Sequence, residues 1–184
     1  MENKNQRLGA QTLKFEQVEL FKSESNSAAT IALHFDTEER NQFCDFTEAV
    51  INIITKSDIK HGSVSLFTPH TTTAVVINES ETGYINDFKK RLEELVPSDS
   101  YYEHDDWDLR TENMQEDENV NGMSHVRGTI IGSSGVTLPI INSELIIGNV
   151  TPEEPIIVPL TCDLPFTFSS SCMFSVLKSQ SSCS

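Results

Sequence analysis

Short apolar runs that alternate with polar residues are the feature that most limits what this chain can fold into. Every second residue from Ala29 to Phe35 is apolar, the pattern of a strand with one buried face. From Leu13 to Leu20 the alternation changes phase, which predicts a strand with a bulge. We expect these two strands to form an antiparallel hairpin. Further strands are expected over 64–66, 74–77, 136–141, 145–150, 156–160 and 166–177.

Two longer segments have helical periodicity instead. From Asp45 to Lys56 the apolar residues fall on one helical face, and Asp45 and Glu48 have the spacing of a capping box. We expect this helix to stop at Lys60–Gly62. The second helix, Gly83–Val96, ends directly before a proline, which cannot continue it.

A short third helix is expected around Met123–Ile130. Strands outnumber helices, so the pattern predicts an α+β fold, a mostly antiparallel sheet with two or three helices. The length of 184 residues suits a single compact domain, which we assign to residues 11–178. We expect residues 1–10 to be disordered and residues 179–184 to form a Ser-rich tail.

The charge balance excludes two classes of partner. The chain has 13 basic and 28 acidic residues, a formal net charge of −15. Such a surface repels nucleic-acid phosphates and anionic lipid headgroups, so we expect neither nucleic acid nor membrane as a partner. The sequence has four cysteines, and their spacing includes no CxxC motif. We expect them to be reduced thiols in a cytoplasmic protein; they are Cys44, Cys162, Cys172 and Cys183.

Histidines are the residues best suited to carry chemistry. His70 follows a predicted strand, His104 lies in an acidic segment, and His125 opens the predicted third helix. Three neutral imidazoles hold zinc and leave a coordination position open, but these lie too far apart in sequence to form a local motif. The alternative is that each is an ordinary loop or capping histidine. We expect structural roles for His34, on the polar side of a strand, and for His61, beside a helix end.

Asn78 and Glu79 follow a predicted buried strand. A carboxylate there suits a general base or a group that orients a histidine. The alternative is a helix N-terminal cap, for which the hydroxyls of Ser80 and Thr82 are also suited.

Two loops have the composition of ligand sites. Gly132–Gly135 offers backbone N–H groups and hydroxyls to an anion, or forms a tight turn. Glu103–Glu118 is strongly acidic and suits a hard cation, but it has no ordered ligand spacing and is also typical of a solvated loop.

Five blocks, taken in order, resemble one known family. They are Phe67–Ala74, Ile77–Glu79 with Asp87–Phe88, Tyr102–Asp105, Asn121–Arg127, and Ile131–Ser134 with Leu138–Ile140 and Leu145–Gly148. Their order and spacing over residues 45–150 resemble the YjbQ family, a family long filed as uncharacterised.

The resemblance implies a compact α+β fold and a homotrimer. It also implies secondary thiamine-phosphate synthase activity, in which a pyrimidine diphosphate joins a thiazole phosphate and pyrophosphate leaves. The substrate is then a small molecule. The family's shared histidines match His70, His104 and His125, which are expected to hold a divalent metal, zinc or magnesium.

Roles for other residues follow from the same resemblance. The catalytic positions match Asn78, Glu79, Asp105 and Arg127, the last where a lysine is usual. The substrate- and anion-binding positions match Thr71, Thr72, Gly132, Ser133 and Ser134.

The chain departs from the family after residue 147. A Gly-Thr-Trp-Gln turn is replaced by Gly148–Thr151, residues 152–155 look like an insertion, and an arginine-containing stretch is replaced by Asp163–Phe166. Arginines clamp phosphates, so a phosphorylated substrate loses contacts here. Two alternatives to the synthase therefore stay open: a catalytically degenerate binding or structural protein of the same fold, and a metal-dependent hydrolase.

Overall fold

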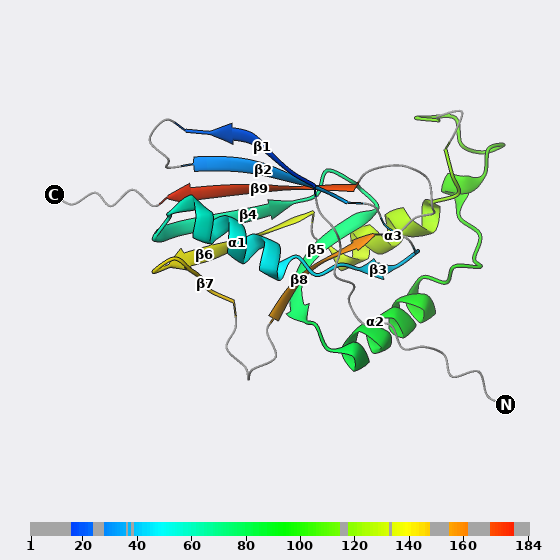
Figure 1. Ribbon diagram of the computed structural model, residues 1–184. Helices are drawn as coiled ribbons and strands as arrows, with labels where there is room; N and C mark the ends of the chain where they lie inside the picture. Colours follow the sequence, from blue (N-terminus) through cyan, green and yellow to red (C-terminus); the bar gives the residue numbers. More distant parts are fainter. Residues whose placement is uncertain are drawn as a thin grey trace.

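The computed structural model describes residues 16–23, 28–35, 37, 39–114, 118–132, 134–147, 155–161 and 170–178. These residues form two antiparallel sheets with helices on both sides (Figure 1). The strands are β1 Glu16–Lys22, β2 Ala28–Phe35, β3 Gln42–Phe43, β4 His61–Phe67, β5 Thr73–Glu79, β6 Gly135–Ile141, β7 Glu144–Leu145, β8 Pro155–Thr161 and β9 Ser170–Lys178. The helices are α1 Thr47–Ser57, α2 Thr82–Leu95, the 3₁₀ turn η1 Glu103–Asp105, and α3 Gly122–Ile131. The expected α+β fold is confirmed, and none of the described helices is long and apolar enough to cross a membrane.

The larger sheet has the strand order β1-β2-β9-β4-β6-β7. The expected N-terminal hairpin is confirmed. Its β1–β2 register shifts between Glu19 and Phe21, later in the strand than the phase change between Phe15 and Val18 that predicted a bulge. Strand β9 pairs antiparallel with both β2 and β4, which puts a late segment of the chain in the middle of the sheet. The order of strands in space therefore differs from their order in sequence.

The main core lies between this sheet and α1. The alternation in β2 buries Ile31, Leu33 and Phe35, and the helical period of α1 turns Val50 and Ile54 toward them. Burying one such side chain contributes about 1.5–3 kcal/mol. The two periodicities read from the sequence thus meet at one interface.

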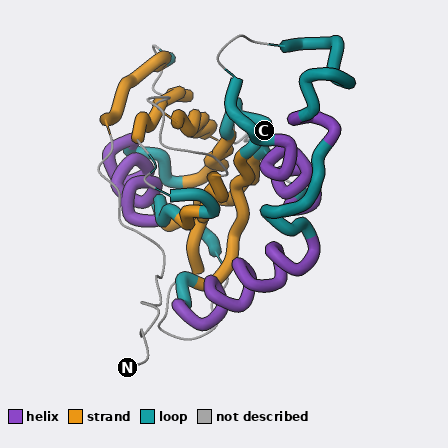
Figure 2. Tube along the Cα trace, turned by 90° about the vertical axis from the view of Figure 1, so that its right-hand side faces the viewer, coloured by secondary structure: helices purple, strands orange, loops and turns teal. Residues whose placement is uncertain are grey.

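The smaller sheet, β3-β8-β5, carries the other helices. Phe43 from β3 packs with Ile85 and Leu92 of α2 in a second apolar cluster. Figure 2 shows the strands lying between one helix on one side and the remaining helices on the other. This second side of the molecule holds the polar residues discussed below.

Two expectations for α1 are wrong. Asp45 forms no capping box: its carboxylate accepts the N–H of Thr47 (2.9 Å) from outside the helix, whose N-cap residue is Phe46. The helix also ends at Ser57, before the expected stop, because Asp58 adopts a left-handed conformation (φ 57°). His61 is consequently the first residue of β4, not a helix-end residue.

Other expectations are shortened or lie outside the described residues. Of the strand expected over 145–150, only Leu145 lies in a strand (β7, Glu144–Leu145) among the described residues. The expected disordered start, the Ser-rich tail, Ser133 and the divergent segments 148–154 and 162–169 fall outside the described residues.

Candidate metal centre

The turn η1, which follows α2 along the chain, carries His104. The chain reaches it from Pro97, whose carbonyl oxygen accepts a hydrogen bond from the Tyr102 hydroxyl (2.6 Å). That bond ties the start of the acidic loop back to the end of α2. His104 follows two residues later, half-buried in the 3₁₀ turn.

Helix α3 carries His125 and begins beside η1. A Cβ atom at Gly122 would lie 2.9 Å from the Cβ atoms of both His104 and Tyr102, so only glycine permits this approach. One helical turn further on, the His125 ring reaches the His104 ring, with 4.6 Å between ring centroids. The close start of α3 therefore brings together two histidines that are distant in sequence.

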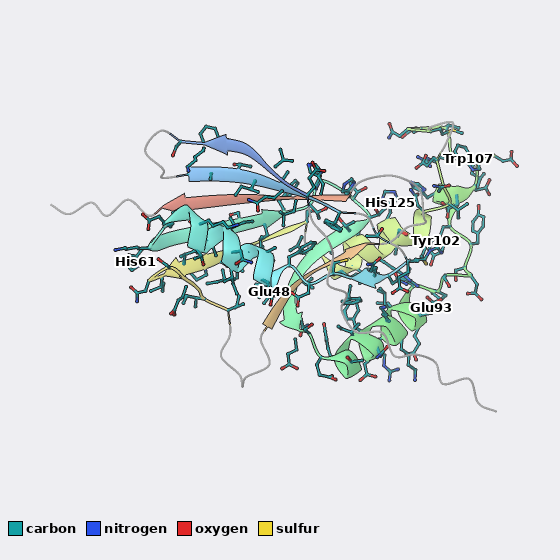
Figure 3. All side chains as sticks on the ribbon, viewed as in Figure 1. Glu48, His61, Glu93, Tyr102, Trp107 and His125 are labelled. Atoms are coloured by element: carbon teal, nitrogen blue, oxygen red, sulfur yellow. The ribbon has the colours of Figure 1, made fainter. Side chains whose placement is uncertain are left out.

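Glu118 completes the cluster. One nitrogen of each histidine and one Glu118 oxygen lie within 4.8 Å of one another, and His104 Nε2 is 3.9 Å from Glu118 Oε1. The second oxygen, Oε2, lies 2.8 Å from Arg110 Nη1. The cluster lines a cavity of about 520 Å³ whose walls are Glu103, His104, Leu109, Arg110, Glu112, Asn113, Glu118 and His125. Figure 3 shows His125 at the opposite end of the molecule from His61.

Burial keeps His125 suited to metal binding. Partial burial lowers the pKa of His125, and the neighbouring His104 lowers it further. A lowered pKa keeps the imidazole neutral at pH 7, the form that offers a lone pair to a cation. The Thr71 hydroxyl lies 3.3 Å from His125 Nδ1, so the ring is held at one nitrogen.

Arg110 is the basic residue among those that line the cavity, and its guanidinium is used internally. Its Nε donates to the Glu112 carbonyl (3.2 Å) and its Nη2 to the Asn113 carbonyl (2.7 Å). Its Nη1 donates to the His104 carbonyl (3.2 Å) beside the ion pair with Glu118. Arg110 therefore folds the acidic loop around the cluster.

His70 lies outside this cluster. It sits between β4 and β5, where its carbonyl oxygen accepts the N–H (3.4 Å) and the hydroxyl (3.0 Å) of Thr73. Its Nε2 is buried and has no hydrogen-bond partner among the described residues, and burial lowers its pKa. The structure thus brings together two of the three expected metal-binding histidines, with Glu118 as the third potential ligand.

Asn78 and Glu79 lie at the far end of β5 from His70. Strand β5 rises about 3.4 Å per residue, so Glu79 is roughly 20 Å from Thr73. The Asn78 side chain bonds to the Tyr84 hydroxyl, and Glu79 is exposed. Asn78 lines a separate apolar groove of about 440 Å³, so neither expected catalytic residue lines the histidine cavity.

The cap expected near Asn78 has a different source. The Glu81 side chain accepts the N–H groups of Gly83 (2.6 Å) and Tyr84 (2.7 Å) at the start of α2. The expected hydroxyls of Ser80 and Thr82 are not the groups bonded there.

Arg127, expected to be catalytic, is fully buried and holds the helices together. Its side chain is 0% exposed and donates to the Val96 carbonyl from Nε (3.0 Å) and to Asn41 Oδ1 from Nη1 (2.9 Å). It also pairs with Glu93 of α2. Because these bonds turn it away from the cavity, its observed role is structural.

The expected anion-binding residues are spread out. Gly132 ends α3 in a left-handed conformation (φ 88°), and the Ser134 carbonyl accepts the Thr68 N–H (2.8 Å). Thr71 contacts His125, whereas Thr72 is not among the cavity-lining residues. Residues 132–135 connect α3 to β6 along the chain, and Ser133 lies outside the described residues.

Sequence reasoning missed Glu118 and Arg110. Both belong to the acidic segment 103–118, which has no recognisable ligand spacing. A single arginine among many carboxylates was the available signal, because a lone cation in an acidic loop is a natural centre for ion pairing.

Comparisons with known sequences identify relatives. A family model described as UPF0047 protein YjbQ-like matches residues 31–152. A UPF0047 protein of Archaeoglobus fulgidus is 34% identical over 116 residues, which cover 63% of this chain and 80% of the relative. A UPF0047 protein of Methanothermobacter thermautotrophicus is 32% identical over 119 residues, which cover 65% of this chain and 75% of the relative.

Comparisons with solved structures agree on the fold. A YbjQ-like protein of unknown function from Sulfolobus solfataricus superposes with a TM-score of 0.68 at 22% identity, covering 83% of this chain and 98% of the other. A hypothetical protein from Aeropyrum pernix gives a TM-score of 0.66 at 24% identity, covering 82% of this chain and 98% of the other. From the sequence match over most of its length and this shared fold, the chain belongs to the YjbQ-like UPF0047 family.

Proposed function

We propose that this protein is a metal-dependent enzyme whose divalent cation is held by His104, His125 and Glu118. The observation that carries the proposal is the approach of their ligand atoms to within 4.8 Å in the wall of a cavity. Two imidazoles and a carboxylate, with room for a further ligand, are the donor set of catalytic zinc sites. Magnesium prefers all-oxygen coordination, so zinc suits these residues better.

The reaction that this donor set supports best is hydrolysis of a small molecule. A cation bound there supplies Lewis acidity and a water molecule of lowered pKa. The chain's own residues prepare the site: Thr71 holds the His125 ring, and Arg110 holds Glu118. The cavity of about 520 Å³ has the volume of a small-molecule site.

A second candidate is the thiamine-phosphate-forming transfer that the family resemblance implies. Membership of the YjbQ-like family supports it. Against it stands Arg110, whose guanidinium is occupied by the loop and is not free to clamp a diphosphate. The remaining alternative is a catalytically degenerate binding protein.

Metal content tests the site first. Protein purified without an affinity tag is analysed by inductively coupled plasma mass spectrometry, beside H104A, H125A, E118Q and H70A. H61A, on the exposed start of β4, is the matched control. We expect stoichiometric zinc in the wild type, H61A and H70A, and loss of zinc in the other three variants.

Two outcomes would contradict this assignment. Loss of zinc in H70A with retention in E118Q would restore the three-histidine site. An unmodified protein that binds no metal after zinc is added would favour the degenerate binding protein.

Turnover separates the reactions. Zinc-loaded protein is offered simple phosphate esters in one assay, and the pyrimidine diphosphate with the thiazole phosphate in another. We expect ester hydrolysis above the metal-free blank and its loss in H125A. Thiamine phosphate as the sole product would instead establish the second candidate, and metal binding without product in either assay would establish a degenerate protein.

We also propose that the chain is a cytoplasmic homotrimer, as expected from the sequence. Exposed apolar side chains around the groove, Ile77, Leu95 and Ile130, support association of copies. The spacing of the four cysteines, which includes no CxxC pair, supports a reducing compartment. Light scattering that gives a monomer mass at micromolar concentration would contradict the trimer.

A further inference from the structure

The carboxylate of Asp105 joins the two elements that carry the histidines. Its Oδ1 accepts the backbone N–H groups of Asn121 and Gly122, both at 2.9 Å, from the first turn of α3. The N-cap residue of that helix, Asn121, provides no side-chain cap of its own. The cap of α3 is thus supplied by a residue of η1 that lies sixteen positions earlier.

The same oxygen faces His104. Asp105 Oδ1 lies 3.5 Å from His104 Nδ1, while His104 Nε2 is directed toward Glu118. Arg110 Nη1 is 3.4 Å from Nδ1, but it is closer to Glu118 Oε2 and to the His104 carbonyl. Because a guanidinium only donates, Arg110 can bond to this nitrogen only in the tautomer that leaves Nδ1 unprotonated. In the other tautomer, a proton on Nδ1 faces the Asp105 carboxylate, so Arg110 and Asp105 compete for this nitrogen.

We propose that Asp105 is a positioning residue that acts on both histidines at once. Its charge keeps the proton of His104 on Nδ1, which leaves the Nε2 lone pair facing Glu118 and the cavity. Its hydrogen bonds hold the start of α3 against η1, which fixes the reach of His125 to His104. The inference rests on the proposed metal site, because carboxylates that orient metal-binding histidines act in this way.

The packing around Gly122 supports a role beyond capping. A Cβ at this position would meet Asp105 Oδ2, His104 Cβ and Tyr102 Cβ, all at 2.9 Å. An ordinary cap needs no such approach between two chain segments. The close contact puts the carboxylate, only 14% exposed, between the helix start and the His104 ring.

Two substitutions separate capping from the effect on His104. Asp105→Asn keeps an oxygen that accepts the two N–H groups, because Asn caps helices as well as Asp. It removes the negative charge beside Nδ1. Asp105→Ala removes both. Asp106→Asn is the matched control: it removes the same charge one residue later, where the side chain contacts Tyr101 and the backbone of Asp108 and Leu109.

Three measurements are made on each protein. Zinc affinity is measured by competition with a chelator, the His104 tautomer by ¹⁵N chemical shifts of the metal-free protein, and the α3 cap by hydrogen exchange of the Gly122 amide. We expect D105N to keep amide protection, to lose the preference for an Nδ1 proton, and to bind zinc roughly 10- to 100-fold more weakly. D105A is expected to lose protection as well, and D106N to match the wild type.

A D105N variant with the wild-type tautomer and zinc affinity within about twofold of the wild type would overturn the proposal, leaving Asp105 as a cap only. If the wild type binds no zinc, the proposed function fails separately. The metal-free tautomer then decides the present inference: a proton on Nδ1 that is lost in D105N supports it, and an unchanged tautomer overturns it.

Discussion

The histidine cavity and the apolar groove differ in lining although they are similar in size. The cavity has a volume of about 520 Å³ and is walled by charged and polar side chains, whereas the groove of about 440 Å³ is walled largely by isoleucine, leucine and aromatic residues. Helix α3 contributes to both, with His125 on the cavity and Ile131 on the groove. One helix therefore contributes side chains to both walls.

The difference lies in what holds each wall in place. The wall of the groove is held in place by apolar side chains that pack around the buried residue Leu92. The cavity rests on directed bonds, such as those of Arg110 and Asp105 to the loop and to α3. We therefore expect the groove to govern stability and the cavity to govern ligand binding, and the following substitutions test that division.

Leu92→Ala should have the largest effect on stability. Leu92 is 4% exposed, and its truncation leaves a cavity in the second apolar cluster. We expect a loss of about 3 kcal/mol in the free energy of unfolding, measured by urea denaturation, with zinc affinity of the folded protein unchanged. The control is Leu95→Ala on the same helix, where 64% exposure predicts little change. Equal losses in the two variants would contradict the division.

Arg127→Met tests the residue that joins α3, which lines both regions, to the end of α2. Met preserves apolar bulk, but the buried Val96 carbonyl loses its donors. We expect a loss of about 2 kcal/mol in urea denaturation, together with weaker zinc binding because α3 is freed from α2. Arg91→Met, which breaks a surface pair with Glu94, should change neither. Full zinc affinity in Arg127→Met would show that α3 keeps its position without this anchor.

Glu118→Gln should have the opposite effect to Leu92→Ala: a small loss of stability and a large loss of zinc binding. The ion pair with Arg110 is largely buried, but Gln keeps an amide oxygen there and Arg110 stays bonded to three backbone carbonyls. The free energy of unfolding should therefore fall by only about 1 kcal/mol. Zinc binding, measured by calorimetry, should be lost because a carboxylate ligand is missing. Glu112→Gln, on the same wall, is the control that should retain zinc. A destabilisation as large as that of Leu92→Ala would show that the cavity also governs folding.

The smallest effect concerns acid stability. Hydrogen bonds from Ser98, and then from Arg127, lower the pKa of Glu93 to about 2 from its ordinary 4.5. A lowered pKa contributes stability above pH 4.5 that is lost as the pH falls toward 2. Glu93→Gln should therefore flatten the fall of the melting temperature over that range, with zinc binding at pH 7 unchanged. An identical acid profile in the variant would show that the carboxylate contributes nothing.

Much of the fold was predictable from local pattern. The alternation in β2 and the helical period of α1 identified both sides of the main core, because burial on one face imposes a period on the sequence. The residues at which helices and strands begin and end were predicted less well. Asp58 ends α1 early by adopting a left-handed conformation, a choice that no hydrophobic period records.

The site was predictable only in part. His104 and His125 were identified from residue type and family resemblance, and they do meet. Glu118 was missed because nothing in the spacing of an acidic loop tells which carboxylate turns inward. Arg127 was expected to be catalytic, although its guanidinium caps a buried carbonyl on another helix. Such pairings join residues far apart in the chain.

The sequence by itself determined the elements, the α+β class and the family, because periodicity and motif order are local properties of the chain. Only the tertiary structure decided which polar groups meet. The start of α3 approaches η1 at Gly122 and is capped there by Asp105, and this contact brings His104, His125 and Glu118 to one cavity. Contacts between distant segments depend on how the elements pack, and packing geometry is not encoded in the spacing of any single segment.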